Sequence, residues 1–118
     1  MNLENFIDFR RAAQSDYLKQ PVEELSATER TAYAKAFISY VIEECVEISR
    51  ELSEGDARYK FFKPSKPVDK AKLLEEYADL VIHVANLGAL LTDDSSEIID
   101  SIQDKIDYNN KRTDHVKD

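Results

Sequence analysis

Glycine and proline are scarce in this chain of 118 residues, which has two glycines and three prolines. Sheet-rich sandwiches and barrels need many tight turns, and such turns depend on these two residues. Folds that hold a nucleotide in glycine-rich turns are excluded for the same reason. The scarcity therefore favours long helices with few connections.

Cysteine is nearly absent as well, since Cys45 is the single example. One thiol excludes an intrachain disulfide and a metal site built from several cysteines, and it fits a reducing compartment. No apolar run approaches the roughly 20 residues that cross a bilayer. The opening residues, MNLENFIDFRR, lack the layout of a signal peptide. We therefore expect a cytoplasmic protein with no membrane partner, in which Cys45 packs and does not react.

Basic residues are outnumbered, because 24 acidic side chains oppose 16 basic ones and the net charge is −8. An acidic surface repels phosphate backbones, so nucleic acid is not an expected partner. The surplus suits divalent cations if several carboxylates converge at one point. The length and the 42% hydrophobic content are those of one folded domain, spanning 1–118.

Helical periodicity runs through almost the whole chain. It predicts four helices, over about 3–19, 26–53, 69–91 and 94–112. Ser26 with Glu29, and Asp94 with Glu97, are spaced as capping boxes, and Asp69 is a candidate N-cap. The lysine-rich and proline-containing stretch GDARYKFFKPSKPVDK is a connection. Four helices with short links predict an all-α helical bundle.

Each predicted helix has an apolar stripe that we expect to face the core. The expected core side chains are Leu3, Phe6, Ile7, Ala13, Tyr17 and Leu18; Phe37, Tyr40, Val41, Ile48 and Leu52; Leu73, Tyr77, Leu80, Val81, Val84, Leu87 and Leu91; and Ile98, Ile99, Ile102 and Ile106.

Acidic residues interrupt two of these stripes. At 100° per residue, Glu44 falls about 20° from the centre of its stripe, and Glu47 lies at the edge. Glu76 lies among the leucines of the next helix, with Asp79 about 60° to one side. A carboxylate in an apolar stripe is unfavourable unless it is hydrogen-bonded, paired or bound to a metal. Two such pairs on facing helices would form a cluster that selects Mg²⁺ or Mn²⁺, although the spacing alone fits ordinary solvated helix charges equally well.

His83 lies about 20° from Glu76 on the same helix. Hard cations rarely bind imidazole, so we expect a hydrogen-bonded interior histidine and not a ligand.

Three motifs give the chain a family resemblance over about 37–115. EECVE at 43–47 and EEYAD at 75–79 resemble the EExxE…ExxD signature of the all-α nucleoside triphosphate pyrophosphohydrolases, which include MazG-like proteins and dimeric dUTP diphosphatases. RYKFFKPSKP followed by LLEEYADLVIHVANLG is similar to the loop and second motif of the dimeric dUTPases. KIDYNNKRTDH resembles the closing Lys–Asn–Arg segment of MazG-like members.

The resemblance implies a four-to-five-helix bundle of the MazG and dimeric dUTPase-like type, completed by assembly into a homodimer or homotetramer. It implies hydrolysis of a nucleoside triphosphate to the monophosphate and pyrophosphate in nucleotide-pool house-cleaning, with dUTP or dCTP as leading substrates. Glu44, Glu47, Glu76 and Asp79 would hold Mg²⁺, for which Mn²⁺ is a possible substitute. Glu47 would also orient or deprotonate the attacking water.

Further residues are candidates for contact with the substrate. Lys105, Asn109 and Arg112 share one face of the last helix and, with Lys63 in the connection, are expected to bind the phosphates. A solvated basic helix end and an exposed lysine loop explain the same residues. Gln14, Phe61, Phe62 and Asn86 are candidates for the base or sugar, although aromatic rings in such a loop also simply pack.

The main alternative of another class is a non-catalytic acidic helical module that binds or regulates a partner. A di-iron bundle is not expected, because neither acidic motif has the required Glu-x-x-His. The chain is shorter than the fuller dimeric dUTPases, which favours a minimal MazG-like unit that completes its pocket across a subunit interface.

Overall fold

The computed structural model describes residues 1–53 and 68–111, and every regular element within these ranges is helical. The elements are α1 (Leu3–Leu18), the short 3₁₀ turn η1 (Val22–Glu24), α2 (Ala27–Ser53), α4 (Lys70–Leu91) and α5 (Ser95–Lys111). The predicted all-α class is therefore confirmed for this part of the chain. The four predicted helices have the expected bounds to within one residue at each end, whereas η1 was not predicted.

Local hydrogen bonds explain where α2 and α4 begin. At α2, Glu29 N–H donates to Ser26 Oγ at 3.1 Å and Ser26 N–H donates to Glu29 Oε1 at 2.9 Å. These reciprocal bonds form the predicted capping box. At α4, Lys72 N–H donates to Asp69 Oδ1 at 3.2 Å, as predicted for an N-cap.

The second predicted capping box, between Asp94 and Glu97, is wrong, because neither side chain bonds the backbone N–H of the other and Glu97 N–H donates to the Asp94 carbonyl at 3.0 Å. Asp94 Oδ1 accepts from the backbone N–H and the hydroxyl of Ser96, at 3.0 and 2.6 Å. The Glu97 carboxylate accepts instead from the Thr92 hydroxyl. Hydroxyl groups on both sides of the helix start offer partners that the simple motif does not consider, so Glu97 does not bond back to Asp94 N–H.

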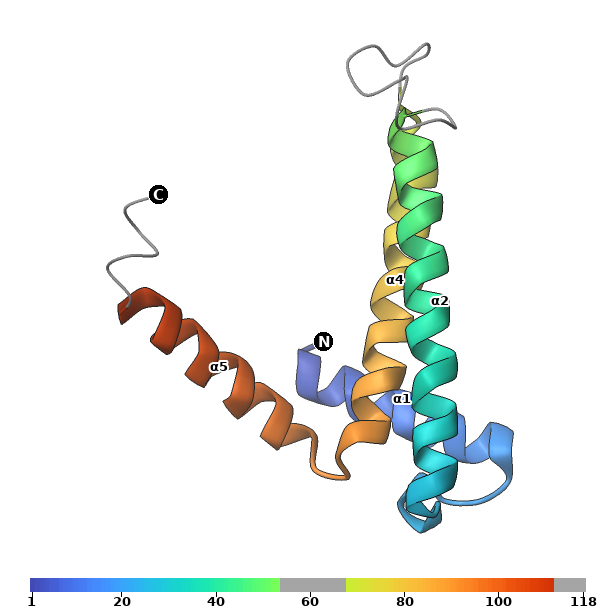
Figure 1. Ribbon diagram of the computed structural model, residues 1–118, viewed down its shortest axis with the longest axis vertical. Helices are drawn as coiled ribbons and strands as arrows, with labels where there is room; N and C mark the ends of the chain where they lie inside the picture. Colours follow the sequence, from blue (N-terminus) through green and yellow to red (C-terminus); the bar gives the residue numbers. More distant parts are fainter. Residues whose placement is uncertain (54–67, 112–118) are drawn as a thin grey trace.

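Helices α2 and α4 form a long antiparallel hairpin, α1 crosses its base, and α5 leaves the base at an angle (Figure 1). We call the region where α1, η1, the first turns of α2 and the last turns of α4 meet the closed end. The hairpin beyond it, residues 41–53 and 70–82, is the open arm. Within the described ranges, no helix combines the length and the apolar character that a bilayer crossing requires.

The buried core lies at the closed end, in two clusters. Ile7 of α1 packs with Ala85 and Ala89 of α4, and Phe6 and Ile98 pack against this cluster. The second cluster joins η1 and the turn before α2 to α4, and its buried members are Val22, Leu25 and Leu90. The core therefore holds α1 and η1 against the end of the hairpin.

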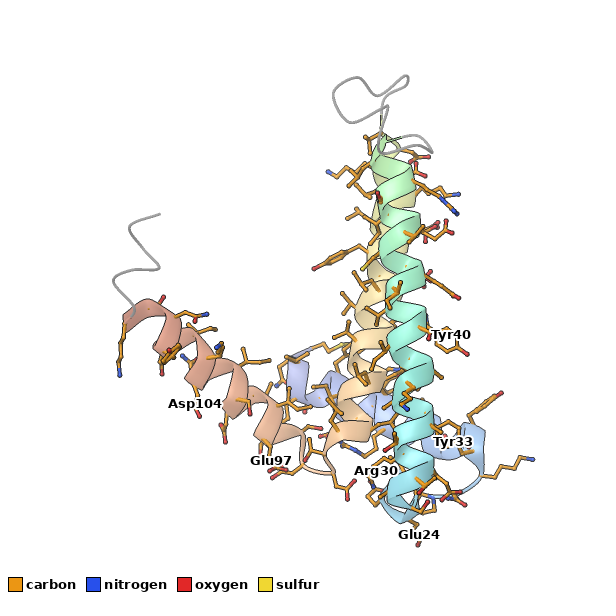
Figure 2. The ribbon with its side chains drawn as sticks, in the orientation of Figure 1. Glu24, Arg30, Tyr33, Tyr40, Glu97 and Asp104 are labelled. Atoms are coloured by element: carbon orange, nitrogen blue, oxygen red, sulfur yellow. The ribbon has the colours of Figure 1, made fainter. Side chains whose placement is uncertain are left out.

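Two arginines complete the end of α4, Arg11 of α1 and Arg30 of α2, the second of which is labelled in Figure 2. The last carbonyls of a helix have no donor within it. The buried Arg11 donates to the carbonyls of Ala89 at 3.4 Å and Thr92 at 2.9 Å. Arg30 donates to the carbonyl of Leu90 at 3.3 Å. These guanidinium groups replace the glycine cap that many helices use.

The predicted apolar stripes are only partly buried, which corrects the expected core. Cys45, expected to pack, is also exposed. Side chains predicted inside but found exposed are Leu3, Tyr17, Tyr40, Leu52, Tyr77, Val81, Val84, Leu91, Ile102 and Ile106. Among the described elements, α2 contacts mainly α4 and α5 diverges from the open arm, so these elements leave part of the wide stripe on either helix uncovered. A closed four-helix bundle is therefore not formed by the described part of a single chain.

Candidate metal centre

Three carboxylates from the two acidic motifs meet where the open arm joins the closed end. Glu44 of α2 faces Glu76 and Asp79 of α4, and one oxygen of each lies within 4.8 Å of the others. Glu76 and Asp79 are three residues apart and are therefore neighbours on one side of α4. The antiparallel pairing of α2 and α4 thus brings together three of the four predicted ligands.

The electrostatics of this cluster are unfavourable without a cation. Burial is the main cause that raises the pKa of Glu44, followed by its hydrogen bond with Glu76 and by the negative charges of Asp79, Glu76 and Glu47. Glu44 Oε2 is buried and has no hydrogen-bond partner among the described residues. In the same part of the chain, no lysine or arginine forms an ion pair with Glu44, Glu76 or Asp79.

The donor set fits a hard divalent cation. Carboxylate oxygens are the ligands that Mg²⁺ and Mn²⁺ prefer. Oxygens around an octahedral Mg²⁺ are about 3 Å apart when neighbouring and about 4.2 Å apart when opposite. The three carboxylates have oxygens within 4.8 Å of one another, which approaches the spacing of ligands to one cation. The orphaned Glu44 oxygen supplies the independent indication that a partner for this group belongs here.

Glu47, the fourth predicted ligand, lies outside this group of three. Its Oε1 is 3.4 Å from Arg50 Nη1, and its side chain is 48% exposed. An exposed pair of this kind contributes little to stability, so the Glu47 carboxylate is readily released. Its charge acts on Glu44, so it is close enough to remain a candidate for water orientation.

His83 stands beside the cluster on α4. Its Nε2 is 4.0 Å from Glu44 Oε1, which is longer than a hydrogen bond. Its Nδ1 is buried without a hydrogen-bond partner in the described chain. The sequence predicts a hydrogen-bonded interior histidine; His83 is half-buried, with 26% of its side chain exposed, and it forms no hydrogen bond with the described residues.

A pocket of about 540 Å³ opens between α1, α2 and α4, next to His83. Its lining includes Arg10, Gln14, Tyr33, Phe37, Tyr40 and Asn86. Two of these, Gln14 and Asn86, are the described residues that the sequence proposed for a base or sugar, and the structure brings them together. Tyr33 and Tyr40 both lie along α2 (Figure 2), and Phe37 lies between them in the helix. The Tyr40 ring lies 5.3 Å from the His83 ring, so the pocket adjoins the carboxylates.

Hydrogen bonds order the polar wall of this pocket. Arg10 Nε donates to Asn86 Oδ1 at 2.7 Å, and Gln14 Nε2 donates to the Asn86 carbonyl at 3.2 Å. Both amide side chains are buried. The Asn86 amide nitrogen and the Gln14 amide oxygen make no hydrogen bond with the described residues. They are thus one donor and one acceptor for an occupant of the pocket.

Sequence reasoning missed Arg10 and the tyrosines as pocket residues. Arg10, Gln14 and Tyr17 are spaced i, i+4, i+7, as are Tyr33, Phe37 and Tyr40, so each set shares one helix face. The sequence pattern placed Tyr17, Phe37 and Tyr40 in the core and gave Arg10 and Tyr33 no role. Tyr17 is in fact 86% exposed, at the rim of the pocket.

The two predicted phosphate-binding residues that the structure describes do not lie at the carboxylates of their own chain. Lys105 and Asn109 lie on α5, which runs outward past Asp104 and away from the hairpin (Figure 2). The Lys105 ammonium lies 5.1 Å from the centre of the Tyr108 ring. Lys63, Phe61, Phe62 and Arg112 lie outside the described residues.

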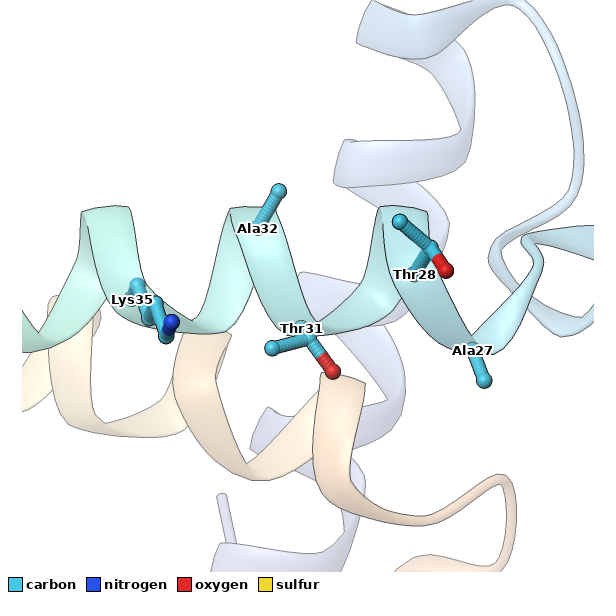
Figure 3. Close-up of a pocket in the computed structure, with 5 residues that line it drawn as sticks. All are labelled: Ala27, Thr28, Thr31, Ala32 and Lys35. Atoms are coloured by element: carbon cyan, nitrogen blue, oxygen red, sulfur yellow. The ribbon is translucent and has the colours of Figure 1, made fainter.

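Another hollow, on the outer side of α2, has no comparable chemistry (Figure 3). It is lined by Ala27, Thr28, Thr31, Ala32 and Lys35, which all belong to α2. Small side chains on one helix leave this depression, and no carboxylate or aromatic ring faces it. It is not a candidate site.

Comparisons with protein-family models, with curated proteins and with solved structures return no match to this chain.

Proposed function

We propose that this protein is a Mg²⁺-dependent nucleoside triphosphate pyrophosphohydrolase of the MazG-like and dimeric dUTPase-like kind. It converts a nucleoside or deoxynucleoside triphosphate to the monophosphate and pyrophosphate, as a house-cleaning activity on the nucleotide pool. The observation that carries the proposal is the meeting of Glu44, Glu76 and Asp79. These residues come from the two motifs that resemble the family signature, and the fold brings them to one place.

The residues have distinct roles in this proposal. Glu44, Glu76 and Asp79 hold the cation, and Glu47 orients the attacking water and accepts its proton. When bound, Mg²⁺ would lower the pKa of that water and offset the negative charge of the triphosphate. The cation is needed also for binding, because a protein of net charge −8 otherwise repels a polyanion.

The pocket between α1, α2 and α4 is the proposed nucleoside site. Tyr33, Phe37 and Tyr40 provide aromatic surface for a base, and Gln14 and Asn86 provide one acceptor and one donor. The pocket adjoins the carboxylates through Tyr40 and His83. The base therefore lies in the pocket while the phosphates reach the cation. A donor beside an acceptor suits the polar edge of uracil or cytosine, which keeps dUTP and dCTP as leading substrates.

Self-association is the proposed means of completing the site. Exposed apolar side chains line both α4 and α5, including Val84, Leu91 and Ile102, and a groove of about 270 Å³ runs between them. A second copy of the chain would cover these side chains. It would also place Lys105 and Asn109 of α5 near the carboxylates of another subunit, since they cannot reach their own. Sedimentation equilibrium tests this, with a monomer at micromolar concentration as the contradicting result.

The deciding experiment measures pyrophosphate release with Mg²⁺ from dUTP, dCTP, dATP, dGTP, dTTP and the ribonucleotides. Glu44→Gln and Asp79→Asn should each abolish turnover and leave the helical circular dichroism intact. The matched control is Glu24→Gln, an exposed carboxylate in η1 that should retain full activity. Full activity of Glu44→Gln would remove Glu44 from the metal centre.

The alternative is a non-catalytic acidic helical module, which the exposed apolar faces of α4 and α5 favour. Calorimetry with MgCl₂ separates the two functions. If the wild-type protein gives no heat with Mg²⁺ and hydrolyses no nucleotide in the panel, the interaction module is the better account.

A further inference from the structure

His83 lies at the junction of the carboxylate cluster and the aromatic pocket. Asp79 precedes it by one helical turn of α4, and Glu44 faces it from α2 with 4.0 Å between Nε2 and Oε1. On its other side, the rings of Phe37 and Tyr40 lie 6.1 and 5.3 Å from the imidazole. These two rings also line the pocket. His83 is therefore in contact with both halves of the proposed site.

Two buried polar atoms at this junction lack partners in the described part of the chain, namely Glu44 Oε2 and His83 Nδ1. Such atoms are rare in folded proteins, and a functional requirement is a common reason for them. Because Nε2 is the nitrogen that faces a carboxylate, the neutral imidazole keeps its proton on Nε2. The buried Nδ1 then carries the lone pair, and this acceptor has no donor in the described part of the chain.

We propose that His83 is a positioning residue that holds the Glu44 carboxylate for cation binding by donating a hydrogen bond from Nε2 to Oε1. The inference rests on the metal centre of the proposed function. A shift of about 1 Å closes the contact to hydrogen-bond length. With Oε1 held in this way, Oε2 is directed at the cation. Groups that orient metal ligands commonly change metal affinity by about 10-fold to 100-fold when they are removed.

The packing of His83 explains why it can position Glu44. The Tyr40 ring is tilted by 42° against the imidazole and the Phe37 ring by 35°. The imidazole is thus flanked by rings on one side and by a carboxylate on the other. A lysine in this place would bring a permanent positive charge to the cation, whereas an imidazole can donate from Nε2 without one.

The test measures the affinity of the full-length protein for Mn²⁺ alone, by calorimetry with MnCl₂, for three variants. His83→Phe keeps an aromatic ring and removes the donor, so it should bind Mn²⁺ about 10-fold more weakly. His83→Gln keeps a donor and should stay within about threefold of the wild type. In a Glu44→Gln background, His83→Phe should have no further effect, because the two residues then act through one interaction. Thermal melting checks that each variant is folded, and His83→Leu replaces His83→Phe if that variant does not fold.

The outcomes separate this inference from the proposed function. If His83→Phe binds Mn²⁺ as tightly as the wild type, the positioning role is overturned, whether or not the protein hydrolyses nucleotides. If the wild type binds Mn²⁺ but hydrolyses nothing, the proposed function fails and the Mn²⁺ affinities still decide the role of His83. A wild type that binds no Mn²⁺ overturns the inference, because no cation then remains for Glu44 to hold.

Discussion

Arginine side chains at the closed end have hydrogen-bond partners, whereas a glutamate side chain where the open arm begins has an oxygen that lacks one. At the closed end Arg11 is buried, yet it donates to two carbonyls and pairs with Asp8 at 2.9 Å. Where the open arm begins, Glu44 is mostly buried against two further carboxylates and has an oxygen with no partner. The closed end therefore stabilises the fold, whereas the carboxylates are arranged against stability. Groups retained at such a disadvantage are typical of sites whose partner is a ligand.

The largest expected difference between the two regions comes from Glu44→Gln. We expect pyrophosphate release to fall by about 1,000-fold, since one cation ligand and one negative charge are lost. The same change should raise the melting temperature of the metal-free protein, because the repulsion of Glu76 and Asp79 is relieved. Activity and melting curves in EDTA measure the two effects. A lower melting temperature would show that the carboxylate stabilises the fold.

Arg11→Met should have the largest effect on stability alone. It leaves the Ala89 and Thr92 carbonyls without donors, and we expect a loss of about 2–4 kcal/mol in the free energy of unfolding. Urea denaturation measures it. Arg50→Met is the matched control in the open arm, where the exposed pair with Glu47 is worth less than about 1 kcal/mol. Equal losses in the free energy of unfolding for the two variants would contradict the proposal that the closed end stabilises the fold more than the open arm does.

The pH dependence of the stability of the metal-free protein should reveal the destabilised carboxylate of Glu44. Because burial raises the pKa of Glu44 above its ordinary 4.5, the folded state binds a proton more readily than the unfolded state. The contribution of protonated Glu44 to the free energy of unfolding is fully present below pH 4.5, and it is lost as the pH rises through the raised pKa of Glu44. Metal-free protein should thus gain stability as the pH falls from neutral toward 5, and Glu44→Gln should lack this gain.

Saturating Mg²⁺ should reverse that trend, because the cation binds the ionised carboxylate. The pKa of Glu29 is lowered by its hydrogen bonds with Ser26, so its contribution is lost only at still lower pH. Melting curves between pH 5 and 8, with and without EDTA, test the effects of Glu44 and of the cation, and curves below pH 4.5 test the effect of Glu29. A wild type and a Glu44→Gln variant with the same pH profile would contradict them.

The smallest expected effect distinguishes the two helix starts. Ser26 and Glu29 exchange two hydrogen bonds at the closed end, whereas Asp69 accepts one, at 3.2 Å, where α4 begins in the open arm. We expect Ser26→Ala to cost about 1 kcal/mol and Asp69→Ala about 0.5 kcal/mol in the free energy of unfolding. Urea denaturation again measures the difference, and a larger cost at Asp69 would reverse the comparison.

Much of the fold could be predicted from the sequence because helix periods and caps are local. The bounds of α2 follow from Ser26, Glu29 and an apolar repeat that runs to Ser53. The prediction at Asp94 failed because Thr92 and Ser96 compete for the same hydrogen bonds. The apolar stripes were assigned to the core correctly where a third element covers them, as at Ile7, and wrongly where none does, as at Val84.

In the candidate site too, the sequence predicts what depends on one helix and does not predict what depends on the packing of several. The pairing of Glu76 with Asp79 follows from a spacing of three residues on one helix. The contact of this pair with Glu44 depends on which faces of α2 and α4 pack together. The aromatic pocket was missed because Phe37 and Tyr40 were assigned to the core stripe of α2, whereas the crossing of α1 over the hairpin leaves a hollow there.

The amino-acid sequence alone determined the helical class, the helix limits and the acidic pairs, because each depends on residues within one or two turns of each other. The tertiary structure decided that three carboxylates converge, that an aromatic pocket adjoins them and that α5 turns away. Those features depend on contacts between residues far apart in the chain, and their geometry is set by helix packing, which no local pattern encodes.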